Sequence, residues 1–254
     1  MAAAETVKVE DADGARWITL DRPPVNVLDL PTIAAIGAAL TALESRRDIK
    51  VVVFRSAIAG TFSAGVEVRD HVRERVGAML DAFHGVVRHL EALPQATVAA
   101  VDGTCLGGGC ELASVCDIVL ATPRSVLGQP EIDVGCFPPV ASVLLPRLVG
   151  RAAAEIVLTG APLSAAAAAR IGLVSRVVDG LDAETRRVVA LLAGKSAAVL
   201  ALARRALREG ASGTFSDALA RVERLYRDEL MATHDAEEGV RAFLEKRPPR
   251  WRDR

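Results

Sequence analysis

Along the first two thirds of the chain, hydrophobic positions alternate between short continuous runs and runs spaced by three or four residues. Continuous runs bounded by turn residues are typical of buried strands, and the wider spacing is typical of amphipathic helices. Strands are predicted at 7–9, 17–20, 51–54, 97–101 and 118–121. Helices are predicted at 30–43, at 70–93 and from Gly108 onward. Strands that alternate with helices indicate a parallel sheet with helical crossovers, and therefore an α/β fold.

After Pro138 the pattern becomes almost entirely helical. One brief strand is predicted near 174–178, and helical segments are predicted at 151–159, 164–170, 182–194, 196–209, 215–231 and 236–246. The sequence contains no internal repeat and no low-complexity linker. We therefore assign 1–195 to a core, and 196–254 to a helical C-terminal region that completes the same unit and contacts other subunits.

The charge balance argues against a nucleic-acid partner. The chain has 31 Lys and Arg against 32 Asp and Glu, a net charge of −1, whereas nucleic-acid binding needs a concentrated basic face. The 51% share of hydrophobic residues is that of a folded protein. No apolar run reaches the roughly 18 residues of a membrane span, and the first residues do not resemble a signal peptide.

Four cysteines lie close together in apolar segments: Cys105, Cys110, Cys116 and Cys136. Their spacing fits neither a Cys-x-x-Cys motif nor a secreted disulfide framework. We expect small buried thiols in a reducing compartment, and therefore a cytoplasmic protein. The histidines lack metal-binding spacing. His84 is interpreted as a helix-surface residue, and His71 borders the loop at Ala64.

A glycine run, Gly107-Gly108-Gly109, follows the predicted strand 97–101 and opens the next helix. Free N–H groups at a helix start can bind an anion or a developing negative charge, and glycine lets a ligand approach the backbone. The run matches neither the G-x-x-x-x-G-K-[ST] nor the G-x-G-x-x-G phosphate motif. The remaining interpretations are an oxyanion hole and tight helix packing.

Two glutamates are candidates for acid–base chemistry. Glu111 lies in the first turn of the helix that the glycines open, where a carboxylate also complements the helix dipole. Glu131 follows a proline turn, where an exposed carboxylate is the ordinary interpretation. If both face one donor pocket, they can act as general acid and base on a bound water. The segment 60–65 is not a G-x-S-x-G nucleophile elbow, so a Ser/His nucleophile is disfavoured.

Several separated motifs together resemble the crotonase (enoyl-CoA hydratase/isomerase) superfamily. They are Leu20-Asp21-Arg22-Pro23-Pro24-Val25-Asn26-Val27-Leu28, Phe62-Ser63-Ala64-Gly65, the stretches 101–117 and 127–135, and Glu238-Gly239-Val240-Arg241-Ala242-Phe243-Leu244-Glu245-Lys246-Arg247. The resemblance implies a spiral of ββα repeats with a helical C-terminal trimerisation region. Trimers, or hexamers made of two trimers, are the implied assemblies.

The resemblance also implies roles for individual residues. The N–H groups of Ala64 and Gly108 would form the oxyanion hole for an acyl-CoA thioester, and Glu111 and Glu131 would activate water and move a proton. Coenzyme A would enter as part of the substrate, with no permanently bound cofactor and no metal. Its contacts would be Pro24, Val25 and Val27, together with Phe243 and Lys246, the last two reaching CoA from a neighbouring subunit.

One departure from the family pattern concerns Pro139. It stands where hydratases usually have a glycine whose N–H helps to hold the catalytic water, and proline has no such donor. The pattern around Phe137-Pro138-Pro139 resembles the cyclohexa-1,5-diene-1-carbonyl-CoA hydratases. Hydration of an enoyl-CoA, in the narrower case a cyclic dienoyl-CoA, is the leading hypothesis. Double-bond isomerisation or other enolate chemistry, and non-catalytic acyl-CoA binding, are the alternatives.

Overall fold

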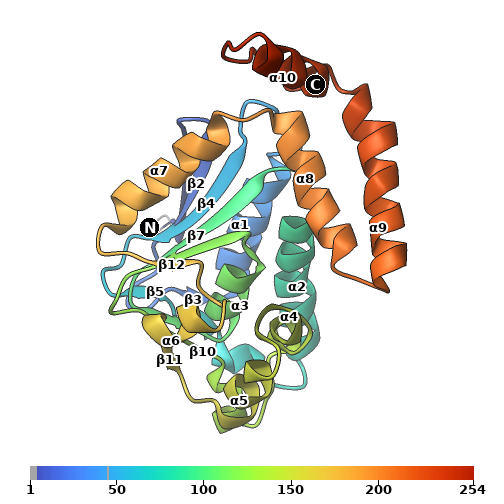
Figure 1. Cartoon of the computed structure of the whole chain (residues 1–254). Helices are drawn as coiled ribbons and strands as arrows, with labels where there is room; N and C mark the ends of the chain where they lie inside the picture. The colour runs from blue at the N-terminus through green and yellow to red at the C-terminus, as the bar shows by residue number, and fades with distance from the viewer. Residues whose placement is uncertain (1–4, 45) are drawn as a thin grey trace.

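A computed structural model describes residues 5–44 and 46–254 (Figure 1). The strands are β1 Val7–Ala12, β2 Ala15–Leu20, β3 Val27–Leu28, β4 Val51–Ser56, β5 Thr61–Ser63, β6 Gly65–Val66, β7 Ala96–Val101, β8 Thr104–Leu106, β9 Ile118–Ala121, β10 Val126–Gly128, β11 Leu163–Ser164 and β12 Arg176–Val177. The helices are α1 Leu30–Thr41, α2 Val76–Ala92, α3 Gly108–Val115, α4 Pro139–Val149, α5 Ala152–Thr159, α6 Ala165–Arg170, α7 Leu181–Ala193, α8 Ala197–Gly210, α9 Phe215–Arg224 and α10 His234–Leu244.

The strands form a six-stranded sheet in the order β1-β2-β4-β7-β9-β12, which is parallel except for the β1–β2 pair. A smaller four-stranded sheet has the order β11-β10-β8-β5, and β3 pairs with β6. Three consecutive units share one plan: β4–β5, β7–β8 and β9–β10 each place the first strand in the large sheet and the second in the small sheet. A helix follows each unit, α2, α3 and α4 in turn. The predicted α/β class and ββα spiral are confirmed.

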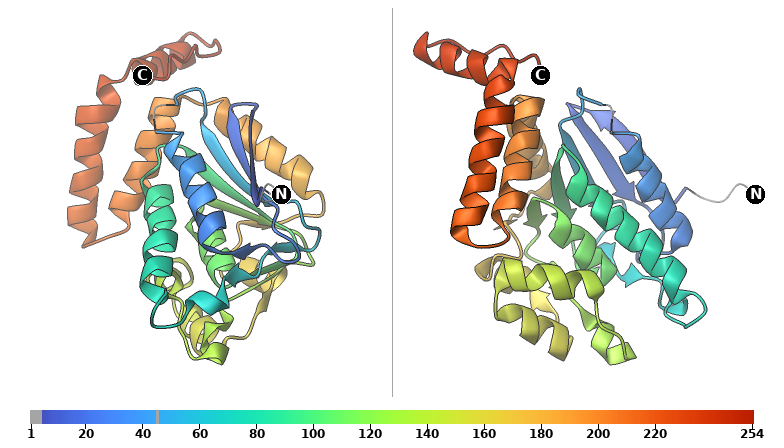
Figure 2. Two further views of the ribbon diagram at one scale, coloured as in Figure 1. Left: turned by 180° about the vertical axis from the view of Figure 1, so that it is seen from behind. Right: turned by 90° about the vertical axis from the view of Figure 1, so that its right-hand side faces the viewer.

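Both faces of the large sheet are covered. Successive strand residues point to opposite faces, so Val51 and Val53 of β4 pack against α7, while Val52 and Phe54 join the larger core on the other face. Helix α1 follows that second face, and α2 packs beside α1 (Figure 2). The continuous apolar strands that the sequence indicated are therefore strands buried on two sides.

The C-terminal helix α8 stands beside α2, α9 packs against the outer side of α8, and α10 lies at the upper end of the molecule (Figures 1 and 2). The buried Arg204 of α8 anchors this region, because its Nε donates to Asp117 Oδ2 at 2.7 Å. Its other guanidinium nitrogens donate to the carbonyls of Leu90, Glu91 and Leu93, where α2 ends. These bonds satisfy helix-end carbonyls that lack an intrahelical partner.

Several predicted boundaries are wrong. The helix expected from residue 70 begins at Val76, because 68–70 form a 3-10 turn and Val72 is exposed. The helix expected over 215–231 ends at Arg224 and continues as a π turn over 225–229 and a 3-10 turn over 230–232. Helix α4 was not predicted at all, although a proline at its first position, Pro139, is compatible with helix geometry.

The cysteine prediction is also wrong for one residue. Cys105, Cys110 and Cys116 are buried free thiols, whereas Cys136 is only half-buried, in the connection between β10 and α4. In the described residues no helix is long and apolar enough to cross a membrane. In the same residues no group of three or more His, Cys, Asp and Glu side chains is arranged to hold a metal ion.

Candidate active site

The glycine run places the start of α3 directly against the segment 63–66. Gly107 has φ +51°, a conformation that favours glycine, and a Cβ there would lie 2.8 Å from Glu131 Oε1. A Cβ on Gly108 would lie 2.5 Å from Val66 Cγ2 and 3.3 Å from Val66 N. These short distances confirm tight packing, one of the two interpretations left open by the sequence.

The backbone donors of this contact differ from the predicted pair. Ala64 N–H already donates to Val25 O at 2.9 Å, so its prediction as an oxyanion-hole donor is wrong. Glu67 N–H donates to Leu28 O of β3 at 3.2 Å. Since successive N–H groups of an extended strand point to opposite sides, the Val66 N–H points away from β3, towards Gly108. Gly108 opens α3, where N–H groups have no intrahelical partner.

Glu111 lies one helical turn into α3 and is only 3% exposed. Its Oε1 accepts a hydrogen bond from Ala141 N–H at 2.8 Å, at the start of α4. The pKa of Glu111 is raised to about 7: burial raises it most, the nearby Glu131 adds to this, and the hydrogen bond from Ala141 opposes both. A carboxyl with such a pKa can give or take a proton near neutral pH.

Glu131 lies in the 3-10 turn Pro130–Val134 that follows β10. Burial raises its pKa above the ordinary value. Its Oε2 is buried and has no hydrogen-bond partner among the described residues. A buried carboxylate oxygen without a partner is costly unless a ligand or water satisfies it, which makes this oxygen a candidate ligand-facing atom rather than an exposed surface charge.

One cavity of ≈ 220 Å³ collects these groups. It is lined by Ala64, Gly65, Val66, Val68, His71, Met79, Leu80, Phe83, His84, Gly107, Gly108, Glu111, Pro130, Glu131, Asp133, Val134, Phe137, Pro138 and Pro139. We call it the glutamate cavity. The structure thus brings together four residues singled out from the sequence, namely Ala64, Gly108, Glu111 and Glu131, although Ala64 contributes no free N–H.

Two further wall residues were not identified from the sequence. Val66 carries the second N–H that faces Gly108, and the exact position of that donor depends on Gly65, whose φ is +104°. His84 lines the glutamate cavity and is half-buried, so its interpretation as a surface residue is wrong. Burial, followed by the charge of Arg88, lowers the pKa of His84, which favours its neutral form. Its only sequence signal was its place one residue after the buried Phe83.

The residues predicted to contact CoA lie outside the glutamate cavity. Pro24 is exposed and Val25 and Val27 are half-buried, in the segment that leads into and begins β3. Phe243 is 83% exposed on α10, and Lys246 follows that helix. Figures 1 and 2 place α10 at the end of the molecule away from α3 and β3. A single chain therefore does not bring Phe243 and Lys246 to the glutamates.

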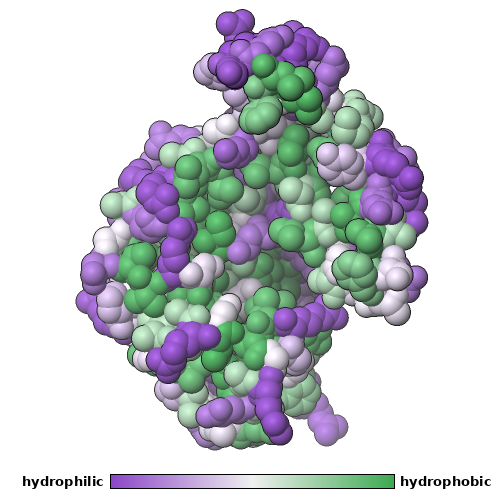
Figure 3. All heavy atoms as spheres, in the orientation of Figure 1, coloured by the Kyte–Doolittle hydropathy of each residue, from purple (hydrophilic) through white to green (hydrophobic). Residues whose placement is uncertain are grey.

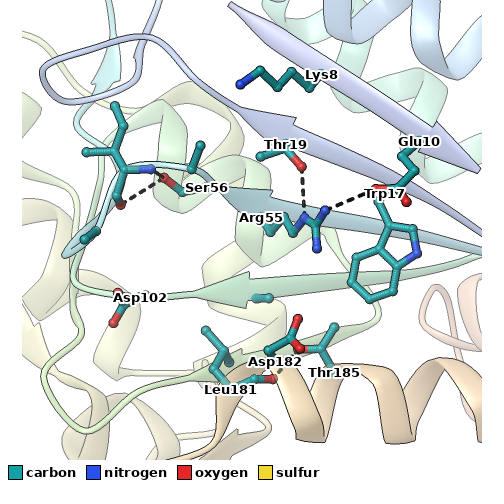
Figure 4. Close-up of a pocket in the computed structure, with 14 residues that line it drawn as sticks. Lys8, Glu10, Trp17, Thr19, Arg55, Ser56, Asp102, Leu181, Asp182 and Thr185 are labelled. Atoms are coloured by element: carbon teal, nitrogen blue, oxygen red, sulfur yellow. Dashed lines mark hydrogen bonds and ion pairs between the residues drawn. The ribbon is translucent and has the colours of Figure 1, made fainter. Parts of the chain in front are cut away.

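Two larger hollows contain none of the predicted acid–base residues. One, of ≈ 540 Å³, lies where β2 and β4 meet α7 and includes Trp17 and Arg55 (Figure 4). The guanidinium carbons of Arg55 and Arg186 lie 4.8 and 5.2 Å from the centroid of the Trp17 ring. The other, of ≈ 600 Å³, is a groove between α2, α4 and α8. Hydrophobic residues surround the hollow between the body and α8 in the space-filling view (Figure 3). The predicted acid–base residues therefore lie in the glutamate cavity, which is smaller than either of these hollows.

Comparisons with known proteins show which family the chain belongs to. The family model for enoyl-CoA hydratase/isomerase matches residues 10–254. The chain is 38% identical over 239 residues to cyclohexa-1,5-dienecarbonyl-CoA hydratase of Thauera aromatica, covering 93% of this chain and 92% of the relative. It is 36% identical to a probable enoyl-CoA hydratase of Mycobacterium bovis, covering 98% and 99% of the two chains.

The chain also resembles solved structures of enoyl-CoA hydratases. The enoyl-CoA hydratase of Mycobacterium smegmatis superposes with a TM-score of 0.91 at 30% identity, over 97% of this chain and 99% of the other. The corresponding protein of Geobacillus kaustophilus gives a TM-score of 0.93 at 27% identity, over 100% and 98%. By its fold, its motifs and these similarities, the chain belongs to the crotonase, or enoyl-CoA hydratase/isomerase, family.

Proposed function

We propose that this protein is a hydro-lyase that adds water across a conjugated double bond of an acyl-CoA thioester. One observation carries the proposal: two glutamates with raised pKa values line the same small cavity as a pair of backbone N–H groups. The N–H pair can polarise a thioester carbonyl while the glutamates handle a water molecule and a proton.

The oxyanion hole in this proposal consists of the N–H groups of Gly108 and Val66. Water addition to a conjugated thioester places negative charge on the thioester oxygen as the enolate forms. Fixed donors aimed at that oxygen stabilise the transition state more than the substrate. From other oxyanion holes, loss of one donor costs about 3–4 kcal/mol of barrier.

The two glutamates divide the proton transfers between them. One ionised carboxylate accepts a proton from water, whose oxygen bonds to the β carbon. The other carboxyl, protonated, gives its proton to the α carbon, so protons and charge balance over the reaction. Burial raises both pKa values, and this favours a pair that holds one proton near neutral pH. The unpartnered Oε2 of Glu131 is a ready acceptor for the water.

Pro139 changes how that water is held. It is the first residue of α4 and offers no N–H, and the next two N–H groups, those of Val140 and Ala141, are both directed at Glu111. We infer that the two carboxylates hold the water without a backbone donor from α4. The same feature favours the second candidate function, double-bond isomerisation, in which a proton moves between carbons and no water is added.

For the acyl group we propose a compact, cyclic dienoyl-CoA. The cavity is small, and Phe83, Phe137, Pro138 and Pro139 give it stiff apolar walls. The relative from Thauera aromatica, which is named as a hydratase of a cyclic dienoyl-CoA, supports this choice. A ring buries its surface in such a space without the chain entropy that a long linear acyl group would lose.

For the CoA part we propose contacts with Pro24, Val25 and Val27 in one chain, and with Phe243 and Lys246 of a second copy. The separation of α10 from the cavity within one chain supports this division. Large apolar side chains exposed on α9 and α10, among them Phe215 and Phe243, support a homotrimer or a hexamer. The proposed reaction requires no cofactor besides the CoA of the substrate.

The test is a panel of linear enoyl-CoAs, cyclic monoenoyl-CoAs and the cyclic dienoyl-CoA, incubated in ¹⁸O-labelled water. We expect ¹⁸O in the product and the highest kcat/KM with the cyclic dienoyl-CoA. Glu111→Gln and Glu131→Gln should each lower turnover at least 100-fold, and full activity of either would refute the mechanism. A shifted double bond without label would favour isomerisation. Acyl-CoA binding without turnover across the panel would indicate a non-catalytic binder.

A further inference from the structure

Ser63 lies between the two backbone segments of the proposed oxyanion hole. It ends β5, and its side chain is fully buried. Its Oγ donates to Asn26 O at 2.7 Å and accepts the Gly65 N–H at 3.1 Å. On the other side, a Cβ on Gly109 would lie 2.6 Å from Ser63 Cβ, so Ser63 packs directly against the start of α3.

Asn26 accepts the hydrogen bond from Ser63 through its carbonyl and fixes the surrounding backbone through its side chain. It is 1% exposed and has φ +50°. Its Oδ1 accepts the Arg22 N–H at 2.7 Å, while its Nδ2 donates to Ser56 Oγ at 2.8 Å and to Phe62 O at 3.0 Å. Both amide hydrogens are therefore used. Asn26 joins its own loop, the end of β4 and the strand that leads to Ser63.

Backbone hydrogen bonds hold the residues on either side, Ala64 and Glu67, and leave the conformation at Gly65 to set the direction of the Val66 N–H. Strand β6 has two residues and pairs only with the two residues of β3. The preceding Gly65, with φ +104°, leaves the backbone free to adopt other conformations. The hydrogen bonds from Gly65 N–H to Ser63 Oγ and from Ser63 Oγ to Asn26 O restrict the backbone at Gly65 and therefore the direction of the Val66 N–H.

We propose that Ser63 and Asn26 are positioning residues that hold the Val66 N–H opposite the Gly108 N–H. The inference rests on the proposed function, in which these two N–H groups bind the thioester oxygen. Neither side chain lines the glutamate cavity. Both act through the backbone, and a misplacement of about 1 Å in such a site can lower the rate about 100-fold.

Ser63→Ala removes both hydrogen bonds of the Oγ and leaves Gly65 N–H and Asn26 O without that partner. Ser125→Ala is the matched control, because the equally buried Ser125 Oγ also accepts a backbone N–H, from Gly103, and donates to a carbonyl, of Val101. We expect similar losses of thermal stability in both variants. Only Ser63→Ala should lower kcat, by 10- to 100-fold, with little change in KM.

Asn26→Asp is the second variant. It keeps the size of the side chain and an oxygen for the Arg22 N–H, but it lacks the amide that donates to Ser56 and Phe62. It should change kcat in the same direction as Ser63→Ala. If Ser63→Ala fails to fold, this variant still tests the proposal against the Ser125→Ala control.

A readout without turnover separates this inference from the proposed function. The C=O stretching frequency of a saturated acyl-CoA, ¹³C-labelled at the thioester carbonyl, should fall on binding to the wild-type protein and fall less in Ser63→Ala and Asn26→Asp. If the wild type lowers the frequency but hydrates nothing, the hydratase proposal fails and the positioning role stands. If both variants keep the wild-type frequency and kcat, the positioning role is overturned.

Discussion

Replacing Glu111 by glutamine should make the protein more stable at alkaline pH. Burial raises the pKa of Glu111 from the ordinary 4.5 to about 7, so folding disfavours the charged form. Below pH 4.5 the carboxyl is neutral in both states and contributes no penalty. Between pH 4.5 and 7 the unfolded chain loses this proton first, and the folded state becomes progressively less stable. Above pH 7 the penalty is constant.

The size of the effect follows from the displacement of the pKa. Each pKa unit corresponds to about 1.4 kcal/mol, which makes the full penalty about 3 kcal/mol above pH 7. Glutamine carries no charge, and its Oε1 can still accept the Ala141 N–H that now binds Glu111. Relative to wild type, Glu111→Gln should therefore gain about 3 kcal/mol of unfolding free energy between pH 4.5 and 8.5.

Urea unfolding of both proteins at pH 4.5, 6.5 and 8.5 measures this gain. Glu223→Gln is the control for the substitution itself, because Glu223 is exposed on α9. A Glu111→Gln difference that is the same at all three pH values would refute the reasoning, since the buried carboxyl would then ionise as easily in the folded state as in the unfolded chain.

Three further changes have defined outcomes. Gly108→Ala brings a Cβ within 2.5 Å of Val66 Cγ2, so kcat should fall at least 100-fold by separating the two donors; a near-wild-type kcat would argue against them. Arg204→Leu leaves the carbonyls at the end of α2 without their guanidinium donor and should cost about 1–3 kcal/mol in chemical unfolding, and an unchanged unfolding free energy would contradict that anchor. Asp102, at the hollow of Figure 4, has its pKa lowered to about 2, first by the hydrogen bond from Arg124. Its stabilisation is full above pH 4 and lost as pH falls through 2, so wild type and Asp102→Asn should converge in acid unfolding; a constant difference would contradict this.

The sequence predicted the helices that show a periodic apolar spacing and the strands that form continuous apolar runs because they are buried on both faces. The apolar run 51–54 became β4, and a three- and four-residue spacing that includes Phe83 and Leu90 became α2. Met79 and Val86 complete the buried face of that helix and were not part of the predicted spacing. Apart from β12, which lies within the strand predicted near 174–178, the two- and three-residue strands were missed, because segments of that length carry no periodic signal. They exist through pairing with partners far along the chain, as β5 does with β8.

The site was predictable to the same extent. Gly108 and Glu111 were identified because a glycine run that opens a helix is a local signal. Ala64 was identified in place of Val66 because the direction of an N–H depends on the backbone conformation at Gly65, and the sequence does not reveal that conformation. The sequence could not predict that Glu131 lies against the start of α3, because this contact depends on how the 3-10 turn Pro130–Val134 packs against Gly107.

The near-neutral pKa of Glu111 results from two opposed contributions supplied by different helices. Helix α3 carries the carboxyl into a buried position, which favours the neutral acid, while the first free N–H groups of α4 favour the charged form. Pro139 sharpens this arrangement. As the first residue of α4 it needs no hydrogen-bond partner, so the start of that helix can approach the cavity without an orphaned N–H. Pro139 thus removes an N–H that could hold the water, and it also lets α4 close the cavity wall without an unpaired polar group. The resulting burial raises the pKa of Glu111, the acid that must exchange a proton.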